Sequence, residues 1–274
     1  MPIVTSYAPG TPSWVDLASP DLAASTAFYS TLFGWDAVDQ GEEAGHYHMF
    51  EIDGVPVAGA GPIMMDGQPP AWTTYVSVED ADESVAKVKA AGGMVFVEPM
   101  DVLDVGRMAV FADPTGAAAA VWQPGRHIGA GLVNEAGALA WNELNTRDTA
   151  AASQFYGAVF GWESVPIAMG PMTYNELQLG GRTIAGMLDI PGDVPGEVPA
   201  HWLAYFGTAD TDSTVAAATS SGASLAVGPV DIPAGRFAVL ADPTGAMFAV
   251  IALAQPAGCP RRGGGPPPVP PVPP

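Results

Sequence analysis

Two short segments of the chain carry a tryptophan followed two residues later by an acid, in WVDLA and in WNELN. The acids are Asp16 and Glu143, and side-chain alternation along a strand puts each acid on the face of its tryptophan. A buried carboxyl group with a raised pKa can serve in acid–base catalysis. Tyr47 and Tyr174 also recur at aligned positions, and a phenol in a closed pocket can act as a general acid. These four are the candidate catalytic residues, with packing as the alternative role of the tyrosines.

Aromatic and basic side chains recur in the same way and indicate a ligand-binding surface. The tryptophans that begin predicted strands are Trp14, Trp72, Trp141 and Trp202. Aromatic rings on a concave sheet favour a flat, hydrophobic ligand, although such rings can equally fill the core between sheet and helices. Arg107 and Arg236 stand in matching GR pairs and can anchor a carboxylate or phenolate ligand; the alternative is a bridge to Asp16 or Glu143. His48 is a further candidate ligand-binding residue. It shares a strand face with His46 in HYH, and two histidines without a repeated third ligand are more often surface or core residues.

The elements that must position these residues are duplicated. Trp14 to Trp35 reads WVDLASPDLAASTAFYSTLFGW, and Trp141 to Trp162 reads WNELNTRDTAAASQFYGAVFGW. Further along, VGRMAVFADPTGA matches AGRFAVLADPTGA. The matches cover nearly all of both halves, so the sequence predicts a tandem repeat.

Each half divides again into two similar units. In the first, WVDLA predicts a strand, Ser19 and Pro20 predict the start of a helix, and Gly34 predicts its end. Two strands with a glycine between them follow, HYHMFEID and VPVAGAGPI. In the second unit a capping box at Asp80 opens the helix, and a DPTG turn joins the last two strands. The predicted fold is α+β, with four units of strand, helix and three strands.

This combination resembles the vicinal oxygen chelate superfamily, which includes glyoxalases, bleomycin-resistance proteins and extradiol dioxygenases. The resemblance rests on the four units, on FYSTLFGW and FYGAVFGW, and on DPTG before a final strand. It implies that two units pair into an eight-stranded, cup-like mixed sheet with outer helices. We expect an N-terminal arm at 1–11, domains at 12–127 and 138–254 with a linker at 128–137, and a disordered Pro/Gly-rich tail at 255–274.

Metal-dependent enzymes of this superfamily hold a divalent ion with His, Gln or Glu ligands. The resemblance puts the ligand positions of the first strands at Trp14 and Trp141 and near Thr73 and Leu203, and those of the last strands at Ala120 and Ala249. None of these side chains is among the expected ligands, so we expect no metal and no other cofactor. The alternative is a relocated site, for which the donors would be Asp16, His48 and Glu51.

Composition excludes several classes of function. With 29 acids against 9 bases and a formal charge of −20, the chain lacks the clustered bases that nucleic acid requires. No apolar stretch approaches the roughly 20 residues of a membrane helix, and the opening residues predict no secretory leader. We expect a cytoplasmic monomer or homodimer.

Two classes of function fit this pattern. The first is a protein that binds a small aromatic or hydrophobic molecule, such as an antibiotic or another natural product, in a metal-free cup. The alternative is a metal-independent isomerase, cyclase or hydroxylase acting on a similar molecule. A metal-dependent glyoxalase or dioxygenase with relocated ligands ranks third.

Overall fold

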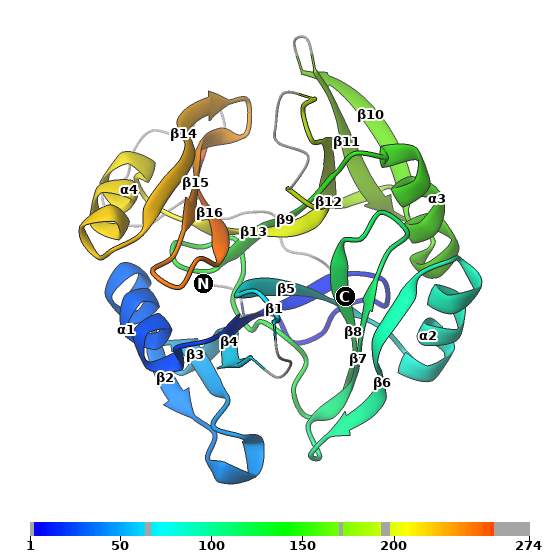
Figure 1. The fold of residues 1–274 in the computed structure, drawn as a ribbon, viewed down its shortest axis with the longest axis horizontal. Coiled ribbons are helices and arrows are strands. Elements are labelled where there is room, and N and C mark those ends of the chain that lie inside the picture. The colour runs from blue at the N-terminus through cyan, green and yellow to red at the C-terminus, as the bar shows by residue number, and fades with distance from the viewer. Residues whose placement is uncertain (1–2, 64–66, 170–171, 193–197, 255–274) are drawn as a thin grey trace.

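The structure is a computed structural model that describes residues 3–63, 67–169, 172–192 and 198–254. These residues form two eight-stranded mixed sheets and four α-helices (Figure 1). The predicted α+β class and the four repeated units are confirmed. The tail predicted at 255–274 lies outside the described residues.

The first half builds one sheet from two units, in the strand order β2-β3-β4-β1-β5-β8-β7-β6. The first unit contains β1 (Pro12–Ser19), α1 (Leu22–Phe33), β2 (Asp36–Asp39), a 3-10 turn (Glu42–Ala44), β3 (His48–Ile52) and β4 (Val55–Pro62). The second contains β5 (Ala71–Ser77), α2 (Ala81–Ala90), β6 (Met94–Val102), β7 (Gly106–Ala112) and β8 (Ala118–Pro124). The opening strands β1 and β5 pair in antiparallel fashion at the centre of the sheet.

The second half repeats this plan, in the order β10-β11-β12-β9-β13-β16-β15-β14. Its first unit contains β9 (Leu139–Thr146), α3 (Thr149–Phe160), β10 (Glu163–Met169), β11 (Met172–Leu179) and β12 (Arg182–Asp189). Its second unit contains β13 (His201–Gly207), α4 (Thr211–Ser220), β14 (Ser224–Ile232), β15 (Gly235–Ala241) and β16 (Met247–Leu253). The antiparallel pair β9 and β13 is therefore the counterpart of β1 and β5.

An aspartate begins every α-helix, because its carboxyl group accepts a backbone N–H of the first turn. The four caps are Asp21, Asp80, Asp148 and Asp210. The start predicted at Ser19 is wrong: its hydroxyl instead accepts the N–H of Asp21. The predicted end of the first helix is confirmed at Gly34, which adopts the left-handed conformation that glycine tolerates best.

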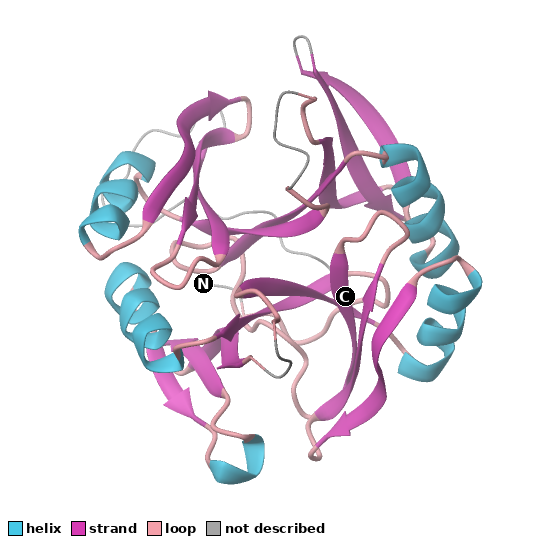
Figure 2. Cartoon of the chain, viewed as in Figure 1, coloured by secondary structure: helices cyan, strands magenta, loops and turns pink. Residues whose placement is uncertain are grey.

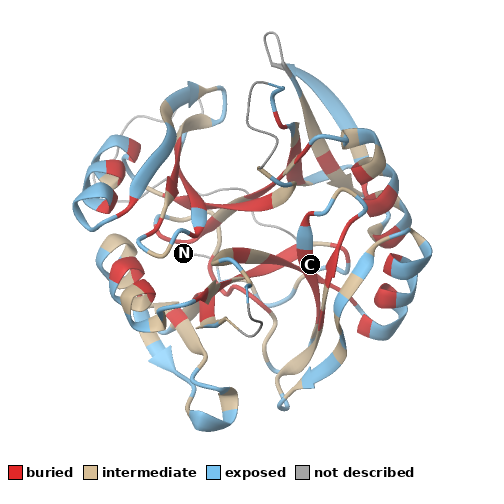
Figure 3. Ribbon diagram, viewed as in Figure 1, coloured by how far each residue is buried: buried red, intermediate tan, exposed pale blue. Residues whose placement is uncertain are grey.

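The two sheets lie back to back, and α1 lies beside α4 as α2 lies beside α3 on the outer sides (Figures 1 and 2). One core cluster contains residues of the first unit, such as Phe28 and Phe50, together with Phe206 and Phe248 of the fourth. A second cluster joins the second and third units in the same way. The buried side chains accordingly concentrate on the central strands and the inner faces of the helices (Figure 3).

The repeated DPTG turn links the halves. In the second copy, Oδ1 of Asp242 accepts both hydrogen bonds of Thr244, from its N–H and its hydroxyl, while Oδ2 accepts the hydroxyl of Tyr29 from the first half at 3.1 Å. The Tyr29 hydroxyl in turn accepts the indole N–H of Trp72 at 2.9 Å. A buried chain of hydrogen bonds thus runs from one sheet to a turn of the other.

Candidate functional site

The concave face of the first sheet, which we call the first cup, has a carboxyl group near its centre. Asp16 on β1 accepts the hydroxyl of Tyr75 at 2.9 Å and that of Tyr47 at 3.4 Å, both on Oδ2. The indole N–H of Trp14 donates to the Tyr47 hydroxyl at 3.1 Å. Burial raises the pKa of Asp16 to about 6, and the hydrogen bonds from Tyr75 and Tyr47 oppose that rise.

The second cup, on the concave face of the second sheet, contains the same group of residues. Tyr205 donates to Oε1 of Glu143 at 2.9 Å, and Trp141 donates its indole N–H to the Tyr174 hydroxyl at 2.9 Å. Glu143 is buried, and burial raises its pKa against the hydrogen bonds of Tyr205, Tyr174 and Asn145. The chain therefore carries two copies of an acid, two phenols and an indole.

Small residues in the neighbouring strand make room for the tyrosines. Gly59 on β4 lies opposite Asp16, and Gly186 on β12 lies opposite Glu143. A Cβ atom at either glycine would overlap the hydroxyl of Tyr47 or of Tyr174, respectively. The short side chains in VAGAGPI and IAGMLDI are thus what allows a phenol to lie across the strand and reach the acid.

The structure brings Asp16 and Tyr47 together with Trp14 in one cup, and their counterparts Glu143, Tyr174 and Trp141 together in the other. It adds Tyr75 and Tyr205, which sequence reasoning missed. Their signal was present, since both follow a strand-opening tryptophan by three residues, in AWTTY and HWLAY.

Trp72 and Trp202 do not line the cups, so the prediction for them is wrong. Their rings lie in the cores between sheets and helices, where Trp72 donates to Tyr29 and Trp202 donates to Tyr156. The physical reason is register: Trp72 pairs with Leu17, a core residue, whereas its neighbour Thr73 pairs with Asp16. The alternative role in packing therefore holds for these two rings.

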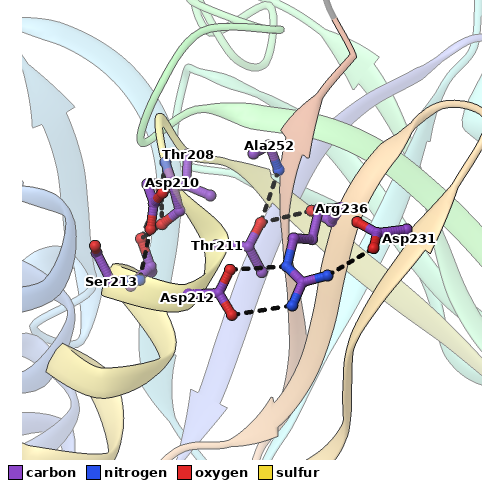
Figure 4. Close-up of polar contacts among 9 residues, drawn as sticks. Thr208, Asp210, Thr211, Asp212, Ser213, Asp231, Arg236 and Ala252 are labelled. Carbon is purple, nitrogen blue, oxygen red and sulfur yellow. Dashed lines mark hydrogen bonds and ion pairs between the residues drawn. The ribbon is translucent and has the colours of Figure 1, made fainter.

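The two arginines also lie on the opposite face from the one predicted. Arg107 donates to Asp82 of α2 and to Asp101 of β6, at 2.8 and 2.9 Å. Arg236 makes the matching pair of contacts with Asp212 and Asp231, at 2.7 and 2.9 Å (Figure 4). Both ligand anchoring in the cup and a bridge to Asp16 or Glu143 are wrong, because the helix-facing acids hold these guanidinium groups.

His48 is also separated from the cup. It alternates with Tyr47 and Met49 on the chain, pairs with the core residue Ala60, and contacts the backbone carbonyl of His46 through Nδ1 at 2.8 Å. To bind a ligand in the cup, as predicted, the His48 side chain would have to lie on the opposite face of β3.

The two cups differ in what covers their tryptophans. In the first, the ring of His127 lies edge-on to Trp14 with centroids 4.6 Å apart, and Trp14 is only 4% exposed. Burial lowers the pKa of His127 to about 4, so its imidazole is neutral. In the second cup Trp141 is only partly buried. The segment after β8 therefore covers the tryptophan of the first cup.

Comparison with known proteins places this geometry in a family. The sequence profile of the Glyoxalase/Bleomycin resistance protein/Dioxygenase superfamily matches residues 11–121 and 138–250. The chain belongs to this superfamily. It is 44% identical over 259 residues to "Putative glyoxylase CFP32" of Mycobacterium tuberculosis (strain CDC 1551 / Oshkosh), covering 92% of this chain and 98% of that protein. It is 41% identical over 277 residues to "Anthracycline biosynthesis protein DnrV" of Streptomyces peucetius, covering 96% and 99%.

Solved structures of the superfamily share the fold. The Mn(II)-bound glyoxalase from Novosphingobium aromaticivorans has a TM-score of 0.61 at 18% identity, covering 89% of this chain and 82% of that one. The 2,3-dioxygenase LapB from Pseudomonas sp. KL28 has a TM-score of 0.61 at 14% identity, covering 88% and 91%. Of the helices in the described part of the chain, none has the length and apolar character needed to cross a membrane.

The superfamily implies a divalent metal in each cup, and the residues present do not fit one. Trp14 and Trp141 stand at expected ligand positions, and each directs its indole N–H to a tyrosine; a protonated indole nitrogen is not a metal ligand. Ala120 and Ala249, at the last-strand positions, offer only methyl groups. Across residues 3–63, 67–169, 172–192 and 198–254, no three side chains of His, Cys, Asp or Glu gather as a metal site would require.

Chemically, each cup presents an oriented carboxyl group at an apolar surface. In the first cup, Oδ2 accepts both phenols, so a proton on Oδ1 could be donated to a bound molecule. Because the pKa of Asp16 is about 6, both protonation states are accessible near neutral pH. The site can therefore donate a hydrogen bond, accept one, or move a proton.

Proposed function

We propose that the protein binds a small aromatic or hydrophobic organic molecule in a metal-free cup. The observation that carries this proposal is the repeated group of an acid, two phenols and an indole, at positions where the superfamily's ligand set is absent. Apolar walls supply the contact area, and a few polar groups would fix the orientation of the ligand. A cytoplasmic location and a monomeric or homodimeric state stay predictions.

The name of one of the relatives supports a natural product as the ligand. A relative 41% identical over almost the whole chain is called an anthracycline biosynthesis protein, which is a role in making a small organic molecule. We infer that the ligand of this chain is such a molecule or an antibiotic related to it.

Calorimetric titration with naphthalen-2-ylmethanol, a neutral aromatic probe, tests the proposal. We expect saturable binding that Trp141→Ala weakens, because the partly buried indole is a wall of the second cup. The matched control is Trp202→Phe, which alters a tryptophan in the core behind the same sheet. Elemental analysis of the protein after incubation with Zn, Ni, Mn or Fe(II) should find far less than one equivalent bound. One tightly held equivalent, or binding insensitive to Trp141, would overturn the proposal.

A second candidate is metal-independent proton transfer, which the raised pKa of Asp16, about 6, favours. A carboxyl group that titrates near neutral pH can remove a proton from carbon next to a carbonyl and return it elsewhere. The test follows deuterium uptake from D2O into 2-tetralone by mass spectrometry. If the protein catalyses proton transfer, Asp16→Asn or Glu143→Gln should slow the deuterium uptake. Equal rates of uptake in both variants and in the unmodified protein would reject this second candidate function.

A further inference from the structure

The second cup contains more negative charge than its surroundings balance. Glu143 is 8% exposed, and the influences on its pKa are burial and the hydrogen bonds of Tyr205, Tyr174 and Asn145, with no basic group among them. A second carboxylate, Glu176 on β11, is close enough to raise the pKa of Tyr174. Among the described residues, no ion pair includes Glu143.

Arg236, which the sequence suggested as a partner of Glu143, does not neutralise this acid. Arg236 is held by Asp212 and Asp231 on the helix side of the sheet, as Figure 4 shows. An uncompensated buried carboxylate is costly, so the site must either take up a proton or receive a cation from outside. The raised pKa of Glu143 favours the first of these responses, the uptake of a proton.

Aromatic rings lie on the same face of the sheet as the acid. Tyr205 and Phe237 lie with ring centroids 6.0 Å apart and belong to a cluster that also contains Trp141. A cation close to such rings is attracted by their π-faces, and most strongly by tryptophan. A carboxylate next to partly accessible aromatic surface is the combination that recognises an organic ammonium group.

The first cup lacks parts of this arrangement. At the positions of Asn145 and Glu176 it has Ala18 and Met49, and Met49 packs in an apolar cluster with Trp14 and Tyr75. His127 also lies against the indole of Trp14 there. The polarity and the accessible indole are therefore features of the second cup.

We propose that the second cup selects an organic cation, namely a protonated amine on an aromatic or apolar body, with the ammonium at Glu143 and the body against Trp141 and Tyr205. This inference rests on the proposed function of the cup as a small-molecule site and specifies the charge of the ligand. Burial raises the pKa of Glu143 and so favours its protonated form, whereas a bound ammonium favours the carboxylate, so a proton and the ammonium compete for this group. Affinity therefore rises with pH through the titration of Glu143, with Tyr174, Tyr205 and Glu176 as the other titratable groups that face the site.

The experiment compares naphthalen-2-ylmethylammonium with naphthalen-2-ylmethanol, which has the same ring system without the charge. By calorimetry near neutral pH we expect the ammonium to bind at least about tenfold more tightly, as a desolvated cation–carboxylate contact implies. Glu143→Gln should remove that preference. Glu163→Gln, the same replacement at an exposed strand end of the same half, should keep it.

The outcomes separate this inference from the proposed function. If the alcohol binds in a Trp141-dependent manner but the ammonium is not preferred, or if the preference survives Glu143→Gln, the cation inference is wrong and the proposed function stands. If neither probe binds, both fail. Titrating the unmodified protein at falling pH, in buffers of different ionisation enthalpy, gives an independent readout should the variant not fold: proton release that grows towards acid pH supports the inference, and its absence at every pH overturns it.

Discussion

Replacing Asp16 with asparagine should change how the stability of the protein depends on pH. The fold raises the pKa of Asp16 from 3.8 to about 6, because burial disfavours the charged form more than Tyr75 and Tyr47 favour it. The native state therefore prefers the protonated carboxyl. This contribution to the free energy of unfolding is complete below about pH 4 and is lost as the pH rises through about 6.

The size of the effect follows from the same shift. One pKa unit corresponds to 1.36 kcal/mol, so the rise from 3.8 to about 6 is worth about 3 kcal/mol, and partial exposure of Asp16 reduces this to about 2 kcal/mol. Between acid and neutral pH, the unmodified protein should lose about that much free energy of unfolding relative to Asp16→Asn. The asparagine does not titrate, so the difference between the two proteins isolates this carboxyl.

Urea denaturation at a series of pH values, followed by tryptophan fluorescence, measures the difference. Glu163→Gln is the control, because Glu163 is exposed and its replacement should give a flat difference across the range. A flat difference for Asp16→Asn as well would refute the reasoning, since Asp16 would then titrate alike in the folded and unfolded chains. A difference of opposite sign would mean that the phenols outweigh burial.

Three further predictions concern the glycine, the interface and the arginine. Gly186→Ala should displace the Tyr174 hydroxyl, which the new methyl group overlaps, and lower the free energy of unfolding in urea by about 1–3 kcal/mol. Gly192→Ala is the control, because a methyl group there meets nothing and should cost far less. Equal losses in the two variants would contradict the packing argument. Tyr29→Phe leaves a buried indole N–H and a carboxylate oxygen of the other half unpaired and should cost about 1–3 kcal/mol of unfolding free energy, whereas an unchanged denaturation midpoint would show that the contact between the halves is dispensable. Arg236→Gln should leave the binding of both naphthalene probes unchanged in calorimetry, because the guanidinium lies on the far side of the sheet, and a large loss of affinity would return it to the site.

Much of the fold was predictable because the sequence contains the same domain pattern twice. Equal spacing in the two copies of the tryptophan-to-FGW segment indicated the duplication, and the DPTG turns located the last pair of strands in each half. The start of the first helix was misplaced because both Ser19 and Asp21 are good capping residues. The structure uses the aspartate to cap the helix and the serine to hold the aspartate's own N–H.

The sequence predicted the site correctly where it showed which face of a strand points into the cup, and failed where it did not. Trp14 and Asp16 share a face, and the prediction for that strand placed both together. Along β5 and the residue that follows it, alternation puts Val76 and Val78 on the same face as Trp72, and both valines pack in the core. This was the one sequence feature that indicated a core position for Trp72. Arg107 alternates with Ala109 and Phe111, both of which pack in the core behind the sheet. Both faces of these strands are apolar, so hydrophobic pattern alone could not tell cup from core.

Each of the two large core clusters is shared between the halves of the chain, so neither half can bury its aromatic residues alone. Phe28 and Tyr29 of the first unit are buried against Phe248 of the fourth, so a fragment ending near the linker would leave an aromatic surface uncovered. Such a fragment has a ready substitute partner, namely another copy of itself, because the two halves repeat the same contacts. The intact protein is in effect a dimer whose two subunits have been joined into one polypeptide. Because the two copies lie in one chain, their sequences can differ, and here His127 covers the tryptophan of one cup while the tryptophan of the other is only partly buried.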